Sequence, residues 1–208
     1  MIIKPGDAER FIAKPPAKIL AVLFYGPDQG LVHERAETIA KTVVDDLTDP
    51  FRVTELDDAT LSADPARLAD EAAAMSMMGG RRVVRVRGAS NAHAKIFENF
   101  LDGAGGDSLV VVEAGELNKG AALRKLFEDS DEAAAVACYP DSARDLPGVV
   151  RAALKDAGLG IGAEALDDAV SRLGADRGVT RRELEKLVLY AHGQSRVELA
   201  DVRAVMGD

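Results

Sequence analysis

The residues whose types and spacing could most readily carry out chemistry lie in a glycine-containing turn near the N-terminus. This turn follows a continuous apolar run at residues 19–25 and precedes a helix-like pattern. A phosphate-binding loop, G-x-x-x-x-G-K-[ST], occurs at such a turn, where amides and lysine hold phosphates and the hydroxyl binds magnesium. Read from Gly26, the positions of the second glycine, the lysine and the hydroxyl hold Leu31, Val32 and His33. The sequence therefore predicts a tight turn into a helix rather than a nucleotide site.

A nucleotide hydrolase also needs a magnesium-binding acid at the end of a buried strand and an acid that orients water. The apolar run 109–112 is followed by Glu113, but Ala114 stands where the second acid is expected. We expect Glu113 and Glu116 to be solvated loop carboxylates. Since both halves of the site are degraded, the pattern indicates the architecture of a nucleotide hydrolase without its chemistry. No catalytic residue and no cofactor is expected.

Cysteine and histidine supply no recognisable reactive or metal-binding group. The single cysteine, Cys138, is expected to be a buried small hydrophobic residue. His33, His93 and His192 lie far apart and have no companion ligands at zinc-binding spacing. We therefore expect no metal site.

The densest basic run comprises Arg81, Arg82, Arg85 and Arg87. One interpretation is a local positive patch close to DNA. The other, which we favour, is that these arginines pair with the surplus carboxylates or protect an edge strand from aggregation.

Three methionines gather where a predicted helix ends. Met75 fits the helical stripe of Leu68 and Ala72, so it is expected in the core. Met77 and Met78 precede two glycines, at a helix end where apolar side chains can be exposed. From the residues alone, burial in the core is favoured over contact with a partner.

The composition excludes several classes of protein. The 208 residues include 26 Lys and Arg against 35 Asp and Glu, which gives a net charge of −9. A protein that binds DNA on its own is expected to have a basic surplus. The N-terminus lacks the pattern of a signal peptide, and the longest apolar run, 19–25, is too short to span a membrane. We expect a soluble cytoplasmic protein.

Strand-like and helix-like runs alternate over the first 140 residues, which is typical of a parallel sheet with helices on both faces. Asp64 as N-cap and Pro65 at the first helical position predict one helix start. The sequence thus predicts an α/β fold with a five-stranded parallel sheet. Its strands are expected at residues 19–25, 51–56, 83–87, 109–112 and 133–139.

The pattern changes after Pro140, where only helical stripes remain. We expect an α/β domain at residues 1–141 and a small all-helical lid domain at residues 142–208. The lid helices are expected around residues 146–154, 166–173, 184–191 and 202–205.

Four segments together resemble the delta subunit of the bacterial DNA polymerase III clamp loader, a degenerate member of the AAA+ group. They are residues 24–36, residues 64–84, residues 109–113 with 123–126, and residues 184–191. The resemblance implies an AAA+-like α/β domain with a degenerate phosphate-binding loop. It also implies a third, collar domain, which is absent after the lid in this sequence.

The resemblance further implies a non-catalytic subunit that binds and opens the sliding clamp for loading onto primed DNA. Such a protein is a nucleotidyltransferase only through membership of the polymerase holoenzyme. The implied partners are the sliding clamp and other clamp-loader subunits, with DNA contacted only within the complex and no membrane.

The clamp-binding element of the family is typically a Leu-Phe pair at the end of the second helix. The matching positions here are Met77 and Met78, preceded by Ser76. This resemblance shifts our expectation for the two methionines from core to contact. Two alternatives stay open: an ATP-dependent AAA+ enzyme with a variant loop, and a generic protein-interaction adaptor.

Overall fold

The structure is a computed structural model that describes residues 1–76, 79–103, 106–139, 146–174 and 177–206. The chain divides into two compact units, Met1–Cys138 and Tyr139–Asp208. The predicted boundary between residues 141 and 142 falls outside the described residues. In the described ranges, no helix combines the length and the apolar composition needed to cross a membrane.

The first unit contains a six-stranded sheet in the order β1-β6-β2-β5-β4-β3, and every neighbouring pair is parallel. The predicted fold class is confirmed. The structure adds one strand, β1, whose two residues are too few to give a periodic signal in the sequence. The strands are β1 (Ile2–Ile3), β2 (Ala21–Tyr25), β3 (Val53–Asp57), β4 (Val83–Ala89), β5 (Leu109–Ala114) and β6 (Ala133–Ala137).

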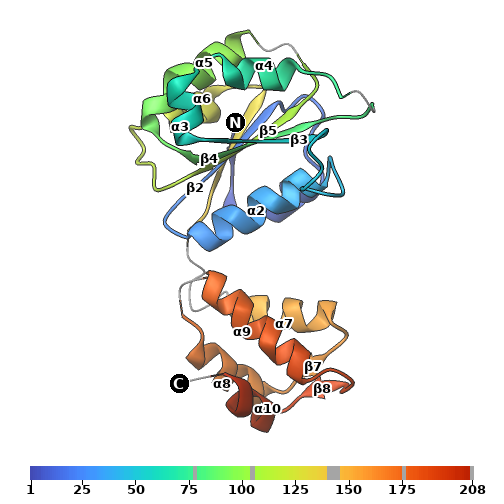
Figure 1. Ribbon diagram of the computed structural model, residues 1–208. Coiled ribbons are helices and arrows are strands. Elements are labelled where there is room, and N and C mark those ends of the chain that lie inside the picture. The colour runs from blue at the N-terminus through green and yellow to red at the C-terminus, as the bar shows by residue number, and fades with distance from the viewer. Residues whose placement is uncertain (77–78, 104–105, 140–145, 175–176, 207–208) are drawn as a thin grey trace. The chain divides into compact units, whose positions relative to one another are not determined.

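Helices cover both faces of this sheet, and Figure 1 shows α2 on one side and α3 to α6 on the other. The α2 face buries Val22 and Phe24 of β2, whereas the opposite face buries Leu23. Burial on both faces explains why the central strand reads as a continuous apolar run. The helices are α1 (Ala8–Ala13), α2 (Gln29–Lys41), α3 (Asp58–Ala63), α4 (Arg67–Ala73), α5 (Ala94–Asp102) and α6 (Ala122–Asp129).

The predicted helix start at Asp64 and Pro65 is wrong. A separate helix, α3, ends just before Asp64, and α4 begins at Arg67. The Asp57 carboxylate accepts the Thr60 amide at 2.8 Å and so caps α3. The Asp64 carboxylate accepts the Ala66 amide at 3.2 Å, two residues further on. The Asp-Pro pair therefore belongs to the turn between two helices.

The second unit has a core of its own, built from α7 (Leu146–Asp156), α8 (Ala163–Arg172), α9 (Arg177–Tyr190) and α10 (Leu199–Val205). A helical C-terminal part is confirmed, but it is not all-helical. The structure adds two short parallel strands, β7 (Gly160–Ile161) and β8 (Arg196–Val197).

Candidate functional site

The turn after β2 is tight because another segment approaches it closely. Gly26 has a φ of +151°, and a Cβ there would lie 2.0 Å from the carbonyl oxygen of Cys138. The Gly26 amide donates to the Gly115 carbonyl at 3.2 Å. A glycine is therefore required by the packing of β2 against its neighbours, independently of any phosphate.

The N-terminus of α2, where a phosphate would bind, is capped by the chain itself. Asp28 is 5 % exposed, and its Oδ1 accepts the Leu31 amide at 2.9 Å. A helix N-terminus favours an anion, and this carboxylate supplies one. Its negative charge opposes the approach of a phosphate to the same amides.

His33 and Glu113 lie together although 80 residues separate them. The Nδ1 of His33 is 3.0 Å from an oxygen of Glu113, and its Nε2 is 3.4 Å from Glu37 on the same helix. The Glu113 side chain is only 12 % exposed. The expectation that Glu113 is a solvated loop carboxylate is wrong, because it lies in β5, where Arg85 also donates to it at 3.3 Å.

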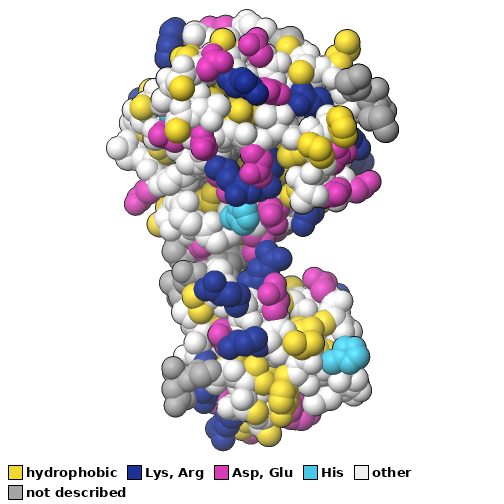
Figure 2. All heavy atoms as spheres, in the orientation of Figure 1, with side chains coloured by type: hydrophobic (Ala, Val, Ile, Leu, Met, Phe, Trp, Pro, Cys, Tyr) yellow, Lys and Arg dark blue, Asp and Glu magenta, His cyan; other side chains and the backbone are white. Residues whose placement is uncertain are grey.

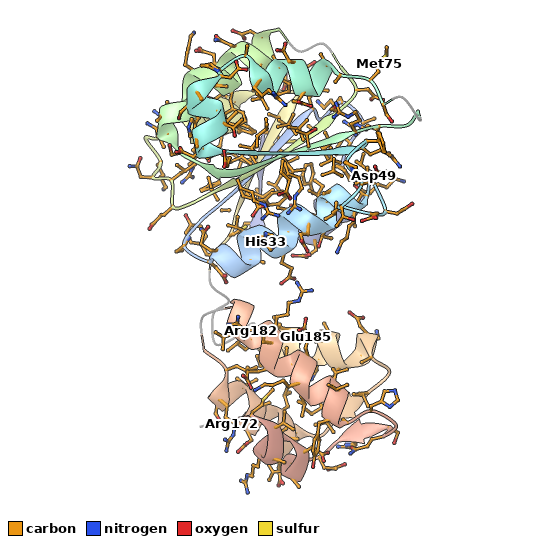
Figure 3. The ribbon with its side chains drawn as sticks, viewed as in Figure 1. His33, Asp49, Met75, Arg172, Arg182 and Glu185 are labelled. Carbon is orange, nitrogen blue, oxygen red and sulfur yellow. The ribbon has the colours of Figure 1, made fainter. Side chains whose placement is uncertain are left out.

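Arg85 is the centre of this charged cluster. Its side chain is 3 % exposed and also donates to Glu55 at 3.1 Å. Arg87 donates to the same Glu55 oxygen at 2.9 Å. Figure 2 shows basic and acidic side chains gathered above α2, beside a histidine that Figure 3 labels as His33. Where a magnesium nucleotide would need free acids, the acids are therefore bound by arginines.

The other two arginines of the basic run also have partners within the fold. Arg82 is 8 % exposed and donates to Thr54 at 2.9 Å and to Glu71 at 3.3 Å. Arg81 donates to the backbone carbonyls of Asp107 at 2.6 Å and Ile19 at 3.0 Å. These contacts favour the ion-pairing interpretation of the run, and proximity to DNA stays a prediction.

Glu71 is held ionised by its surroundings. Burial alone would raise the pKa of its carboxyl, but hydrogen bonds from Thr54 and Arg82 and the charge of Arg67 outweigh burial. The net effect is a pKa below the usual value. This ionised carboxylate joins α4 to β3 and to Arg82, which directly precedes β4.

Met75 is the exposed apolar residue at the predicted contact element. Its side chain is 91 % exposed, so the expectation that it lies in the core is wrong. The physical reason is that α4 ends at Ala73 and Ala74 is extended, with ψ of 130°, which takes Met75 off the helical stripe. Ser76 is half-buried, and Met77 and Met78 lie outside the described residues.

Phe51, which the sequence pattern predicts at the start of a strand, lies outside that strand. The strand β3 begins two residues later, at Val53, and Phe51 is 62 % exposed in the preceding turn. An exposed phenylalanine at a strand edge has no distinct sequence signal, because the same residue suits a buried strand.

A cavity of about 410 Å³ lies at the carboxyl ends of β4 and β5. Two of the polar side chains in its lining serve the fold, since Asn91 accepts the Leu123 amide and Asn118 accepts the Gly120 amide. The described residues contain no group of three or more histidine, cysteine or acidic side chains that could hold a metal ion. The cavity is lined by Ala89, Ser90, Asn91, Gly115, Glu116, Leu117, Asn118, Gly120 and Ala121.

Comparisons with known proteins agree on one relationship. The family model described as DNA polymerase III, delta subunit, matches residues 22–138. A probable DNA polymerase III subunit delta of Rickettsia prowazekii is 24 % identical over 189 residues, which cover 91 % of this chain and 56 % of the relative.

Solved structures share the fold. A DNA clamp loader delta protein of Bacillus subtilis superimposes with a TM-score of 0.69 at 21 % identity, over 96 % of this chain and 61 % of the other. The Thermotoga maritima RuvB Holliday junction branch migration motor has a TM-score of 0.56 at 12 % identity, over 98 % of this chain and 68 % of its own. The chain thus spans 56 % to 61 % of the two delta proteins.

Proposed function

The chain belongs to the DNA polymerase III delta subunit family, and on that premise we propose that it binds the sliding clamp and favours its open form. A ligand shifts such an equilibrium only by its differential affinity for the two states. Binding energy would therefore be used to stabilise an open ring during loading onto primed DNA.

The observation that carries this proposal is the exposure of Met75. It begins the segment Met75-Ser76-Met77-Met78, which occupies the place of the clamp-binding element implied by the family resemblance. Met75 is 91 % exposed just after α4, a helix that buries Leu68 and Ala72. Methionine adapts its shape to an apolar pocket, which suits such a contact.

We propose a subunit without catalysis of its own. The two places where a magnesium nucleotide would bind are occupied by contacts within the chain: Asp28 caps α2, and Glu113 is bound by His33 and Arg85. Any polymerase activity would belong to the assembly. The further proposed partners are other clamp-loader subunits, with DNA reached only within the complex in the cytoplasm.

We also propose that the two units correspond to an AAA+-like domain at residues 1–141 and a lid domain at residues 142–208. The separate cores of the units support this division.

Binding of the chain to its own organism's sliding clamp tests the proposal. The variant Met77→Ser/Met78→Ser is expected to bind the clamp at least about tenfold more weakly, because it lacks both anchoring side chains. Leu189→Ser is the matched control, because Leu189 is an exposed leucine, 76 % accessible, in the second unit. Equal binding by the double variant and the control would contradict the assignment of the contact. Turnover of magnesium ATP by the isolated chain would favour the alternative of an AAA+ enzyme.

A further inference from the structure

Two exposed apolar side chains lie in the segments that lead into the amino-terminal ends of β3 and β4. Phe51 precedes β3, and Met75 lies between α4 and β4. They are 62 % and 91 % exposed. Because β3 and β4 are parallel neighbours, the segments that enter them reach the same end of the sheet, where both strands begin. Figure 3 labels Asp49 and Met75 on that side of the unit, and Figure 2 shows hydrophobic side chains gathered there.

Two arginines hold these segments against the start of β4. Arg52 follows Phe51, and its Nη2 donates to the carbonyls of Val43 at 2.8 Å and Arg81 at 3.0 Å. The Val83 amide donates to the Arg52 carbonyl at 2.8 Å. The segment carrying Phe51 is therefore fixed to the entry of β4.

The segment carrying Met75 is fixed to the same entry. Arg82 donates from Nη1 to the carbonyl of Glu71 at 3.0 Å and to that of Ala74 at 3.3 Å. Ala74 directly precedes Met75, so Arg82 fixes the chain just after the end of α4, immediately before Met75. Phe51 and Met75 are thus carried by two segments that Arg52 and Arg82 fix to the entry of β4.

The turn that presents Phe51 is also ordered locally. The Asp49 carboxylate accepts the Phe51 amide at 2.8 Å, and the Asp49 carbonyl accepts the Val53 amide at 2.9 Å. A phenyl ring on such a turn loses little conformational freedom on binding, because it has only two side-chain torsions.

We infer that Phe51 is an aromatic anchor for the sliding clamp and extends the contact surface that begins at Met75. This inference rests on the proposed function. By the family resemblance, positions 77 and 78 belong to the contact element, and both hold methionine. Interface energy concentrates in buried aromatic anchors, which methionines do not supply. Phe51 supplies a ring on a segment that, like the segment of Met75, is fixed to the entry of β4. The ring enters an apolar pocket on the clamp.

The test is equilibrium binding of the full chain to the clamp, with Phe51→Ser and a matched control. Ile2 is equally exposed, at 62 %, and lies on β1, at the opposite edge of the sheet from β3. We expect Phe51→Ser to weaken binding about tenfold or more and Ile2→Ser to stay within about twofold of wild type. Circular dichroism checks that both variants are folded.

A second variant tests burial of position 51 directly. The chain contains no tryptophan, so Phe51→Trp introduces a single one. Its emission, corrected for that of the clamp alone, is expected to shift to the blue on binding, and Ile2→Trp is expected to show no shift.

The outcomes separate the inference from the proposed function. Tight binding by wild type with unchanged binding by Phe51→Ser, or no shift for Phe51→Trp, would overturn the role of Phe51 and leave clamp binding intact. Absence of binding by the wild-type chain would overturn the proposed function and the inference with it.

Discussion

Charged side chains replace apolar ones along the α2 face of the sheet as β3, β4 and β5 approach their carboxyl ends. Val83 is followed on the same face by Arg85, and Val111 by Glu113. The change of residue type turns the crevice that binds ligands in open α/β sheets into an internal ion-pair cluster. Among the described residues, this end of the sheet is therefore held together by ion pairs centred on Arg85.

The buried arginine at the centre of this cluster is expected to matter for stability. Arg85→Ala removes the buried partner of Glu113 and should lower the free energy of unfolding by about 3 kcal/mol. Arg87→Ala, in which the lost side chain is 45 % exposed, should cost about 1 kcal/mol or less. Urea denaturation of both variants measures the difference, and equal losses would contradict the assigned role of Arg85.

Glu71 is expected to contribute to the pH dependence of stability. Its pKa is lower in the folded chain than its ordinary value of 4.5, so the unfolded state binds the proton more readily. The contribution of Glu71 is therefore present above pH 4.5 and is lost as the pH falls through its lower folded pKa.

The variant Glu71→Gln removes this titration. Its urea midpoint should fall less steeply than that of wild type between about pH 5 and pH 3. If the urea midpoints of the two proteins changed in parallel with pH, Glu71 would have the same pKa in the folded and unfolded states, which would contradict this prediction.

The element that joins β2 to α2 is set by backbone packing. Gly26→Ala would place a methyl group 2.0 Å from the Cys138 carbonyl oxygen and should cost about 3 kcal/mol or more. Gly115→Ala is the control, because a Cβ there meets nothing within 4 Å. Thermal melts of both variants check this, and similar melting temperatures would contradict the packing argument.

The elements that the sequence predicts well are those with long apolar signals. The buried strands and the longer helices follow from continuous or periodic apolar runs, as residues 19–25 illustrate. The two-residue strands β1, β7 and β8 are too short for a pattern. The helix start at Asp64 is wrong because the side chains of Asp57 and Asp64 organise two short helices and a turn.

The candidate site was predictable only in part, because its contacts join distant residues. The loss of the phosphate-binding loop follows from the residue types at positions 31–33. The pairing of Arg85 with Glu113 depends on the alignment of β4 with β5, which no local pattern records. The exposure of Met75 depends on where α4 ends, and that point depends on Arg82 as well as on the helix sequence.

On the scale of the whole molecule, the two units have separate hydrophobic cores. Met75 and Phe51 both belong to the first unit. We therefore expect a fragment of residues 1–138 to unfold cooperatively and to bind the clamp within about threefold of the intact chain, since its anchors are complete. Circular dichroism and a binding titration test this, and a fragment that folds without binding would place essential contacts in the second unit.

The net charge of −9 also bears on which partners the whole molecule can bind. It opposes autonomous binding to DNA and is compatible with a protein whose principal partner is another protein.

We propose that clamp binding by this chain needs no nucleotide, because Asp28 caps α2 and Arg85 binds Glu113. One calorimetric titration of the chain into the clamp, with and without magnesium ATP, tests it most directly. We predict saturable binding with the same dissociation constant in both conditions. No binding, or binding that appears only with magnesium ATP, would contradict the account.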